Sequence, residues 1–393
     1  MTGFNDNVGR SGWRRACAAV LLLLIQAQFH TVFAAPVVPT DAGQILERLP
    51  PRDGAAWDDI RSLQAALARN PADASVAAEL ARSYLELNRG IGDPRLVAYA
   101  SRALAHWEGA TAPPVDVALE RALIAQTEHR FDAAREEIAG VLERSPRSAQ
   151  AWLALAALDT VQGRYADAKR SCARLVLLQD ATIAGACFAT VQVMTGDAAA
   201  AYRFLSNNLA RPESLDAEST AWLATLAAET AEGLRLHDDA DRHYRAALAA
   251  STTPSIYLLT SYSDFLLRRG RPAEVIALLA GTPPADTLWL RLALAEARTG
   301  RSDPVRIATL RYRLELALRG QERAHAREAA FFALYLDDDA RRALTLALDN
   351  WAVQREQIDA RLVLEAAAAA QMPDATQPVR DWLTSSHSEW AAP

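Results

Sequence analysis

The stretch AQAWLALAALDTVQGRYADAKRSCARLVLLQD, residues 149–180, decides the fold of this chain. It predicts two short helices rich in alanine and leucine, which are strong helix formers, separated by a turn at Gly163 and Tyr165. We expect Gly163 to end the first helix, because glycine readily adopts the left-handed backbone conformation that other residues resist. Small side chains at Ala156 and Ala168 would let the paired helices approach closely. The stretch therefore predicts a helical hairpin.

Neighbouring stretches repeat this arrangement at a spacing of about 34 residues. The positions that recur in register are Ala134, Ala168 and Ala201, then Leu142, Val176 and Leu209, and the aromatic pair Phe131 and Tyr165. Each hairpin exposes an apolar face that only the next hairpin can cover. Successive hairpins should therefore stack, and beyond Gly300 their register is harder to follow.

This unit resembles the tetratricopeptide repeat, which places a tryptophan, a leucine and a small residue on the first helix and an alanine and an aromatic residue on the second. Trp152, Leu155 and Ala168 match that pattern. The chain departs from it where Ala156 replaces the glycine, Asp159 the tyrosine, Cys172 the aromatic residue and Asp180 the closing proline. The resemblance implies an all-α superhelix, an α-α solenoid, of about nine helix-turn-helix repeats over residues 57–385. A related helical-hairpin repeat is the alternative.

Composition agrees with one continuous helical array. Apolar residues make up 51% of the 393 residues, and strand-like runs of valine, isoleucine and threonine are nearly absent. We expect residues 35–56 to form a partly ordered leader and residues 386–393 a tail, and no linker divides the array between them. Trp382 and Leu383 would lie on a helix that closes the array, since end repeats need a different outer face.

Residues 1–34 have the pattern of a secretory signal peptide. Three arginines precede an apolar run over residues 16–25, which is half of the roughly 20 residues that a membrane-spanning helix needs. Small residues then predict cleavage after Ala34. The chain would be periplasmic or secreted, and not an integral membrane protein after cleavage. The alternative is an uncleaved membrane anchor.

The charge of the chain narrows the classes of partner. The formal net charge is −6, and removal of residues 1–34 would make it more negative, since that segment carries three arginines and one aspartate. Nucleic-acid binding depends on a basic surface that displaces counterions from phosphates. The acidic balance argues against nucleic acid, and against an anionic membrane surface, as the main partner.

Two cysteines, Cys172 and Cys187, lie beyond the predicted cleavage point. They fall on consecutive predicted helices that should pack together, so they could form a disulfide in an oxidising compartment. The alternative is that they are two small core side chains, because sequence alone does not give the Cα separation that the bond requires.

The sequence lacks the motifs of common enzyme classes. It has no G-x-S-x-G nucleophile elbow, no H-E-x-x-H zinc motif and no G-x-x-x-x-G-K-[ST] phosphate loop. An acidic cluster could offer metal ligands: His237, Asp238, Asp239, Asp241 and His243. Aspartates at a helix start ordinarily cap the helix, and we interpret this cluster and residues 337–339 as caps. We therefore predict no catalytic residue, no cofactor and no metal site.

In arrays of the tetratricopeptide family the first helices line a concave groove that takes a peptide or a helix. Carried onto this chain, the resemblance places the partner groove at Leu153, Ala157, Val161, Val193, Met194, Trp222, Leu226 and Tyr257. This surface is mostly apolar, and the alternative is that its smaller side chains pack against adjacent first helices.

Chaperone-docking members of the family hold a terminal carboxylate with lysines and asparagines of the groove. This chain has one lysine, Lys169, which the repeat places on a second helix. No matching set of groove arginines and asparagines is predicted, so carboxylate docking is disfavoured. We expect recognition of an extended or helical segment through apolar anchors.

These observations predict a non-catalytic protein-interaction scaffold in the cell envelope, which binds a peptide or helix of a partner protein in a concave groove. Two alternatives stay open. One is a periplasmic solenoid enzyme that cleaves peptidoglycan, which would need a separate catalytic domain of about 100 to 150 residues. The other is a tetratricopeptide subunit of a polysaccharide export or secretion apparatus.

Overall fold

The structure is a computed structural model that describes residue 41 and residues 52–179, 181–211, 215–319 and 325–388. The chain divides into two compact units, residues 1–51 and 52–393. The predicted signal peptide, its cleavage site and most of the predicted leader lie outside the described residues, as does most of the predicted tail.

The described part of the second unit contains helices and no strand, and its helices pair as nine consecutive hairpins preceded by α2 (Ala55–Arg69). The first helices of the hairpins are α3 (Ala74–Ile91), α5 (Val115–Thr127), α7 (Ala149–Val161), α9 (Ala181–Met194), α11 (Ala217–Gly233), α13 (Ile256–Arg268), α15 (Asp286–Arg298), α17 (Ala326–Tyr335) and α19 (Gln357–Ala369). The second helices are α4 (Arg95–Ala103), α6 (Phe131–Arg144), α8 (Tyr165–Leu175), α10 (Ala198–Leu209), α12 (His237–Ala250), α14 (Pro272–Leu278), α16 (Pro304–Arg319), α18 (Ala340–Trp351) and α20 (Gln377–Ser386). Short 3-10 helices follow α4 (Ala105–Trp107) and α19 (Pro373–Thr376). The predicted all-α solenoid is confirmed.

Each of these nine hairpins turns through one residue with a left-handed backbone conformation. Five turns use glycine, with φ between 64° and 80°: Gly92, Gly163, Gly196, Gly270 and Gly300. The other four use a residue with a side chain, with φ between 53° and 61°: His129, Arg235, Asp338 and Gln371. A side chain in this conformation crowds the following carbonyl oxygen, at a cost of about 1 kcal/mol. The left-handed turn predicted at Gly163 is confirmed.

The two helices of the hairpin over residues 149–180 pack closely against each other, as the small side chains of this stretch predict. Ala156 is 2% exposed and Ala168 is 0% exposed, so the paired helices meet without a bulky side chain between them. Asp159 stands where the tetratricopeptide pattern has a tyrosine, and it is buried. Its carboxylate is neutralised by Arg135, 2.7 Å away, on the preceding second helix. A charge pair has therefore replaced an aromatic contact between repeats.

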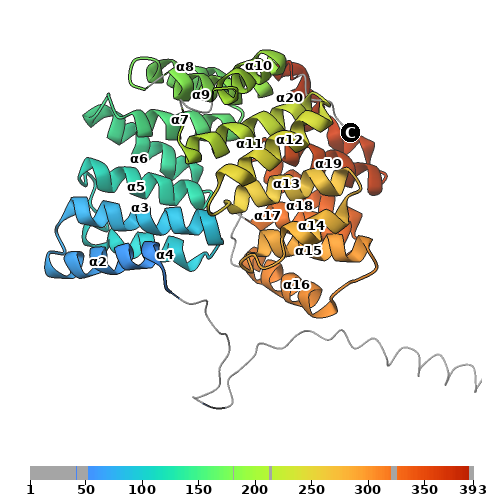
Figure 1. The fold of residues 1–393 in the computed structure, drawn as a ribbon, viewed down its shortest axis with the longest axis horizontal. Coiled ribbons are helices and arrows are strands. Elements are labelled where there is room, and N and C mark those ends of the chain that lie inside the picture. The colour runs from blue at the N-terminus through green and yellow to red at the C-terminus, as the bar shows by residue number, and fades with distance from the viewer. Residues whose placement is uncertain (1–40, 42–51, 180, 212–214, 320–324, 389–393) are drawn as a thin grey trace, which may run out of the picture. The chain divides into compact units, whose positions relative to one another are not determined.

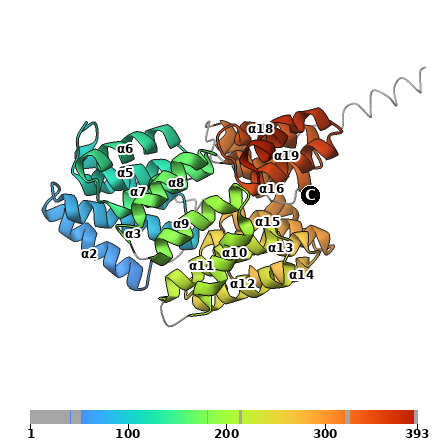
Figure 2. The same cartoon turned by 90° about the horizontal axis from the view of Figure 1, so that it is seen from above.

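The C-terminal hairpins fold back against the middle of the array (Figures 1 and 2). The indole Nε1 of Trp382 on α20 donates a hydrogen bond to the hydroxyl of Tyr165 on α8, at 2.8 Å. The backbone N–H of Arg355 donates to the carbonyl of Val161, at 2.8 Å. A single core cluster joins residues of α7–α9 with residues of α17–α20. Trp382 therefore does not face outward as an end cap, but is 6% exposed within this core.

A second close approach joins the start of the array to its later repeats. The turn after α3 lies so near the starts of α13 and α15 that a Cβ atom on Gly92 would come within 2.7 Å of Ala285 and 3.2 Å of Ile256. Only glycine fits there, because a side chain would clash with Ala285 and would also have to adopt the left-handed φ of 64°. The array therefore curves enough to bring α3 beside α13.

Candidate functional site

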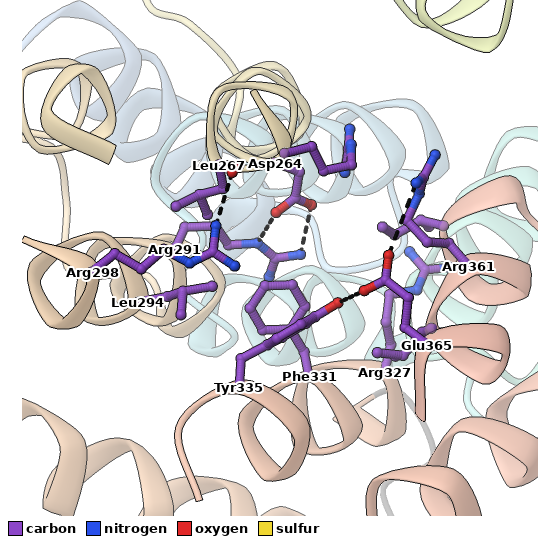
Figure 3. Close-up of a pocket in the computed structure, with 13 residues that line it drawn as sticks. Asp264, Leu267, Arg291, Leu294, Arg298, Arg327, Phe331, Tyr335, Arg361 and Glu365 are labelled. Carbon is purple, nitrogen blue, oxygen red and sulfur yellow. Dashed lines mark hydrogen bonds and ion pairs between the residues drawn. The ribbon is translucent and has the colours of Figure 1, made fainter. Parts of the chain in front are cut away.

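The first helices of the last four hairpins line a pocket with a volume of about 330 Å³ (Figure 3). This volume is at the lower end of the range for ligand sites. Helices α13, α15, α17 and α19 contribute side chains from successive turns, so the pocket belongs to the inner face of the stack. Five of the lining residues are arginines: Arg268, Arg291, Arg298, Arg327 and Arg361.

A buried ion pair ties α13 to α15 inside this pocket. Arg291 donates from Nε and Nη2 to the two carboxylate oxygens of Asp264, both at 2.9 Å (Figure 3). Arg291 is 1% exposed and Asp264 is 6% exposed. The guanidinium also lies 4.6 Å from the ring centre of Phe331 on α17, a favourable cation–π geometry. Arg291 thus joins three consecutive first helices.

A hydrogen-bonded ion pair also links α11 to α13. Arg268 donates two hydrogen bonds to Glu232, at 2.7 and 2.9 Å. One turn before Glu232, the carboxylate of Glu229 accepts a hydrogen bond from the hydroxyl of Ser261 at 2.8 Å. Burial raises the pKa of Glu229 to about 7, although hydrogen bonds from Tyr257 and Ser261 oppose this shift. Glu229 therefore changes its charge near neutral pH.

The series of ties continues from α17 to α19. Arg327 donates to both carboxylate oxygens of Asp359, at 2.6 and 2.8 Å, and also to Glu356. The hydroxyl of Tyr335 donates to Glu365, and burial together with the charge of Glu365 raises the pKa of Tyr335. Because each tie joins one first helix to the next, this ladder of polar contacts fixes the spacing of the inner face.

Two further arginines, Arg298 and Arg361, line the pocket. Arg298 is exposed, and its Nη1 donates to the carbonyl of Leu267 at 2.8 Å. No carboxylate of the described residues forms an ion pair with it. Arg361 lies 3.9 Å from Glu365, and burial and the nearby charge of Arg268 lower its pKa.

Part of the predicted partner groove is covered by the chain itself. Leu153, Val193 and Met194 pack into or against the core cluster that joins α7–α9 to α17–α20. Val161 lies in the same region, since its carbonyl accepts the hydrogen bond from Arg355. The groove expected at α7 and α9 is thus occupied by the returning C-terminal hairpins.

The remaining predicted groove residues are more accessible. Trp222 and Leu226 are partly buried against a small core cluster of α9–α11. Ala157 is exposed, and Tyr257 on α13 is 56% exposed. Tyr257 precedes Asp264 by two turns on α13, so it lies on the same face of that helix as the ladder of polar contacts. Of the predicted groove residues, Ala157 on α7 and Tyr257 on α13 are therefore the exposed ones.

These later helices carry charge that the sequence reading does not predict. The expected groove residues do not extend beyond α13, and they do not include the five arginines that gather on α13–α19. Helical spacing offers a signal, because Arg291 and Arg298 are separated by two turns on α15 and so share a face. Which face turns inward depends on contacts between distant repeats, and the sequence pattern does not show them.

The acidic cluster at the start of α12 is used in pairwise contacts. Asp239 accepts a hydrogen bond from the hydroxyl of Tyr202 at 2.9 Å, and the same hydroxyl lies 3.2 Å from Nε2 of His243. The N-cap position is Leu236, and no side chain caps the helix. The interpretation of this cluster as helix caps is therefore wrong.

The second acidic group does contain a cap. Asp339 precedes α18 and accepts a hydrogen bond from the backbone N–H of Arg342, at 3.0 Å. Within the described ranges, no group of three or more histidine, cysteine or acidic side chains is arranged to hold a metal ion. Among the helices of those ranges, none combines the length and apolar character needed to cross a membrane.

Cys172 of α8 and Cys187 of α9 are joined by a disulfide, with their Cα atoms 5.6 Å apart. Both residues are buried, with exposed fractions of 0% and 5%. The bond links the hairpin α7–α8 to the hairpin α9–α10, beside the core cluster that the C-terminal helices complete.

No protein-family model and no curated protein matches the chain. Several solved structures match it over most of its length. The APC/C hetero-tetramer Cut9-Hcn1 matches with a TM-score of 0.42 and 14% identity over 79% of this chain and 60% of that chain. Yeast Tom70 matches with a TM-score of 0.38 and 10% identity over 85% of each chain. A tetratricopeptide repeat protein from Parabacteroides merdae has a TM-score of 0.28 and 11% identity, over 82% of this chain and 92% of that chain.

The chain has a tetratricopeptide-like fold. This assignment rests on the nine described hairpins, on their left-handed turns and on the buried small residues Ala156 and Ala168. The superpositions, with TM-scores below 0.5, add no argument about function.

Proposed function

We propose that this protein is an exported, non-catalytic scaffold that binds a peptide or helix of a partner protein on the inner face of its later first helices. The observation that carries the proposal is the accessible inner face of α13–α19, where a pocket of about 330 Å³ lies on the same face as the exposed ring of Tyr257. Hairpin arrays bury the faces between neighbours and leave a concave surface for another molecule.

The rigidity of this face supports binding of a structured segment. The ladder of polar contacts already holds Arg268, Arg291 and Arg327 in fixed geometries, so these side chains lose little conformational freedom when a partner arrives. Aromatic rings at Phe331 and Tyr335 line the same pocket. Rigid aromatic and arginine side chains are enriched among the residues that dominate binding energy in protein interfaces.

Site-specific crosslinking in cells tests the binding face. A photoreactive amino acid at Tyr257, on the inner face, is compared with the same replacement at Tyr312, which is 46% exposed on the second helix α16. We expect discrete crosslinked partner bands at position 257 that are absent at position 312. No product at 257, or identical products at both positions, would contradict binding on the inner face.

Two features support export. Residues 1–34 have the pattern of a signal peptide, and a buried disulfide joins Cys172 and Cys187, as is typical of proteins in oxidising compartments. Fractionation with N-terminal sequencing tests this part of the proposal. We expect a periplasmic or secreted chain that begins at Ala35 and whose two thiols react with alkylating agents only after reduction. A full-length cytoplasmic chain with free thiols would rule export out.

The non-catalytic part of the proposal has its own test. Purified mature protein is incubated with peptidoglycan, and soluble muropeptides are measured against a buffer control. We expect no release above the control, and release that scales with protein concentration would favour the peptidoglycan-cleaving alternative.

A further inference from the structure

Helix α16 is apolar on two opposite faces. Its inner face packs into the core through Leu310 and Leu314, which are 0% and 4% exposed. Its outer face carries Val305, Tyr312 and Leu316, with exposed fractions of 73%, 46% and 57%. A surface helix of a folded domain ordinarily turns polar residues toward water. The outer face of α16 therefore presents apolar surface that no other described helix covers.

The exposed side chains of α16 form one continuous stripe. Val305, Tyr312 and Leu316 recur at helical spacing, and the exposed Ala308 falls between them on the same side. Among the described residues, eight large apolar or aromatic side chains are exposed, and three of them belong to this outer stripe. The helix lies at the lower edge of the described helices (Figure 1). Exposed apolar side chains that gather in this way mark interaction surfaces.

Ion pairs border the outer stripe on both sides. Each pair joins a charged residue of α16 to a residue of a neighbouring hairpin helix or turn: Arg311 to Asp337, Glu315 to Arg342, Arg313 to Asp286 and Arg306 to Glu296. The first two pairs lie toward α18 and the last two toward α15. An apolar centre within a polar rim is the usual arrangement of a protein interface.

Two arginines at the ends of the outer stripe stand outside this rim. Arg301 precedes α16 by three residues, Arg319 is the last residue of the helix, and both are exposed. No carboxylate in the part of the chain that the structure describes pairs with either guanidinium. The stripe therefore carries an unmatched positive charge at each end, and its binding partner should carry negative charge at the corresponding positions.

A second copy of this chain would not supply that charge. Leu310 is midway between Arg301 and Arg319 and lies at the middle of the stripe. An antiparallel pair of α16 helices would thus set each arginine against an arginine of the other copy, and a parallel pair would do the same. Like charges placed together across an interface disfavour association.

An anionic lipid surface also fits the outer stripe poorly. Its phosphates would meet the carboxylates of the two rims, among them Glu315 and Asp286, as well as the two end arginines. A single helix is only about 10–12 Å wide, so it can contact the stripe between the rims. Charge and shape together favour a helix over a membrane.

We propose that the outer stripe binds an amphipathic helix of a partner protein that carries an acidic residue at each end of its own apolar stripe. At 1.5 Å per residue the stripe from Val305 to Leu316 is about 16 Å long, so the two acidic positions should be about 12 to 18 residues apart. The inference goes beyond the proposed function, because no residue of the stripe lines the inner pocket.

Synthetic helical peptides test the inference. Three stapled peptides share one leucine stripe and carry glutamate, glutamine or lysine at both of its ends. Their binding to the mature chain is measured by fluorescence anisotropy at low ionic strength, where surface charges are least screened. The variants are Leu316→Ser and the double change Arg301→Glu with Arg319→Glu. The matched control is Arg102→Glu with Arg203→Glu, which makes the same charge change at exposed arginines of α4 and α10.

We expect the wild-type chain to bind the glutamate peptide about tenfold more tightly than the lysine peptide, since two surface ion pairs replace two repulsions. The Arg301→Glu, Arg319→Glu chain should prefer the lysine peptide, and the control chain should keep the wild-type order. Leu316→Ser should weaken binding of the glutamate peptide about tenfold. All the changed side chains are exposed, so each variant should keep the wild-type circular dichroism spectrum.

Several results would overturn the inference. They are equal affinity for the three peptides, a glutamate preference that survives the charge reversal, and no peptide binding at all. Dimerisation in sedimentation velocity that Leu316→Ser abolishes would assign the stripe to a second copy instead. Flotation with phosphatidylglycerol vesicles that the same change abolishes would assign it to lipid. The proposed function is tested separately by crosslinks at Tyr257, whose products should differ from any formed on the outer stripe.

Discussion

Removal of the Trp382 indole should loosen the contact by which the end of the chain returns to its middle. The indole is 6% exposed, packs edge-on against Trp351 with ring centres 5.1 Å apart and donates to Tyr165. A buried tryptophan removes about 150–250 Å² from water, which at 25 cal/mol per Å² gives an upper estimate of about 4–6 kcal/mol. Tryptophan-to-alanine changes in cores cost about 3–5 kcal/mol, so we expect Trp382→Ala to fall in that range.

A milder variant separates the hydrogen bond from the packing. Tyr165→Phe keeps the ring and leaves the indole N–H without its acceptor, which should cost about 1–3 kcal/mol. Combining Tyr165→Phe with Trp382→Phe in a double-mutant cycle gives the coupling between the two side chains. The control is Trp107, which lies in the 3-10 helix after α4, outside this cluster, and whose change to phenylalanine should leave the coupling unaffected.

The assay must resolve local unfolding, because repeat arrays do not always unfold in one step. Native-state amide exchange followed by mass spectrometry reports the opening of α20 and α8 separately. In Trp382→Ala both helices should exchange faster, with a loss of about 3–5 kcal/mol in the protection of α20, while α3 and α4 keep theirs. Protection of α20 within about 1 kcal/mol of wild type would refute the reasoning, since the indole would then not hold the C-terminal hairpins in place.

Three further predictions concern the repeats and their charges. Ala168→Leu should lower stability by about 1–3 kcal/mol through overpacking at a site with no free space, whereas leucine at the exposed Ala166 should leave the melting temperature unchanged; equal melting curves for the two would contradict this. Because burial raises the pKa of Glu229 from 4.5 to about 7, the folded chain binds an extra proton and should lose stability as the pH rises between these values. Urea unfolding of Glu229→Gln should show a flatter profile over that range, and parallel profiles would disprove the shift. Arg235→Gly should stabilise the chain by up to about 1 kcal/mol, because glycine accepts the left-handed φ of 61° without strain, and a lower melting temperature would contradict it.

The hairpins could be predicted from sequence because their signals are local. Ala156, Gly163 and Ala168 lie within one repeat, and each acts through its immediate neighbours. The register was hard to follow beyond Gly300 for an equally local reason. The next two turns place Asp338 and Gln371 in the left-handed position, so two turns in succession lack the glycine that marks five of the seven turns before them.

The inner pocket could not be predicted in the same way. Its lining comes from four first helices spread over α13–α19, and the curvature of the whole stack decides which side of each helix turns inward. Met194 shows the difference. Its helical position favours a partner groove, but the returning C-terminal hairpins bury it. Arg291 and Asp264, 27 residues apart, meet only once two repeats have stacked.

The return of α20 to α8 has a consequence for the order in which the molecule can be built. In an open row of repeats, each module can fold as soon as its neighbour is present. Here the core around Tyr165 is completed by Trp382, 217 positions later, so this core cannot be complete until the segment that carries Trp382 has been synthesised. Contacts between such distant segments slow folding. A polypeptide that crosses a membrane unfolded would thereby leave this core incomplete until α20 has emerged on the far side.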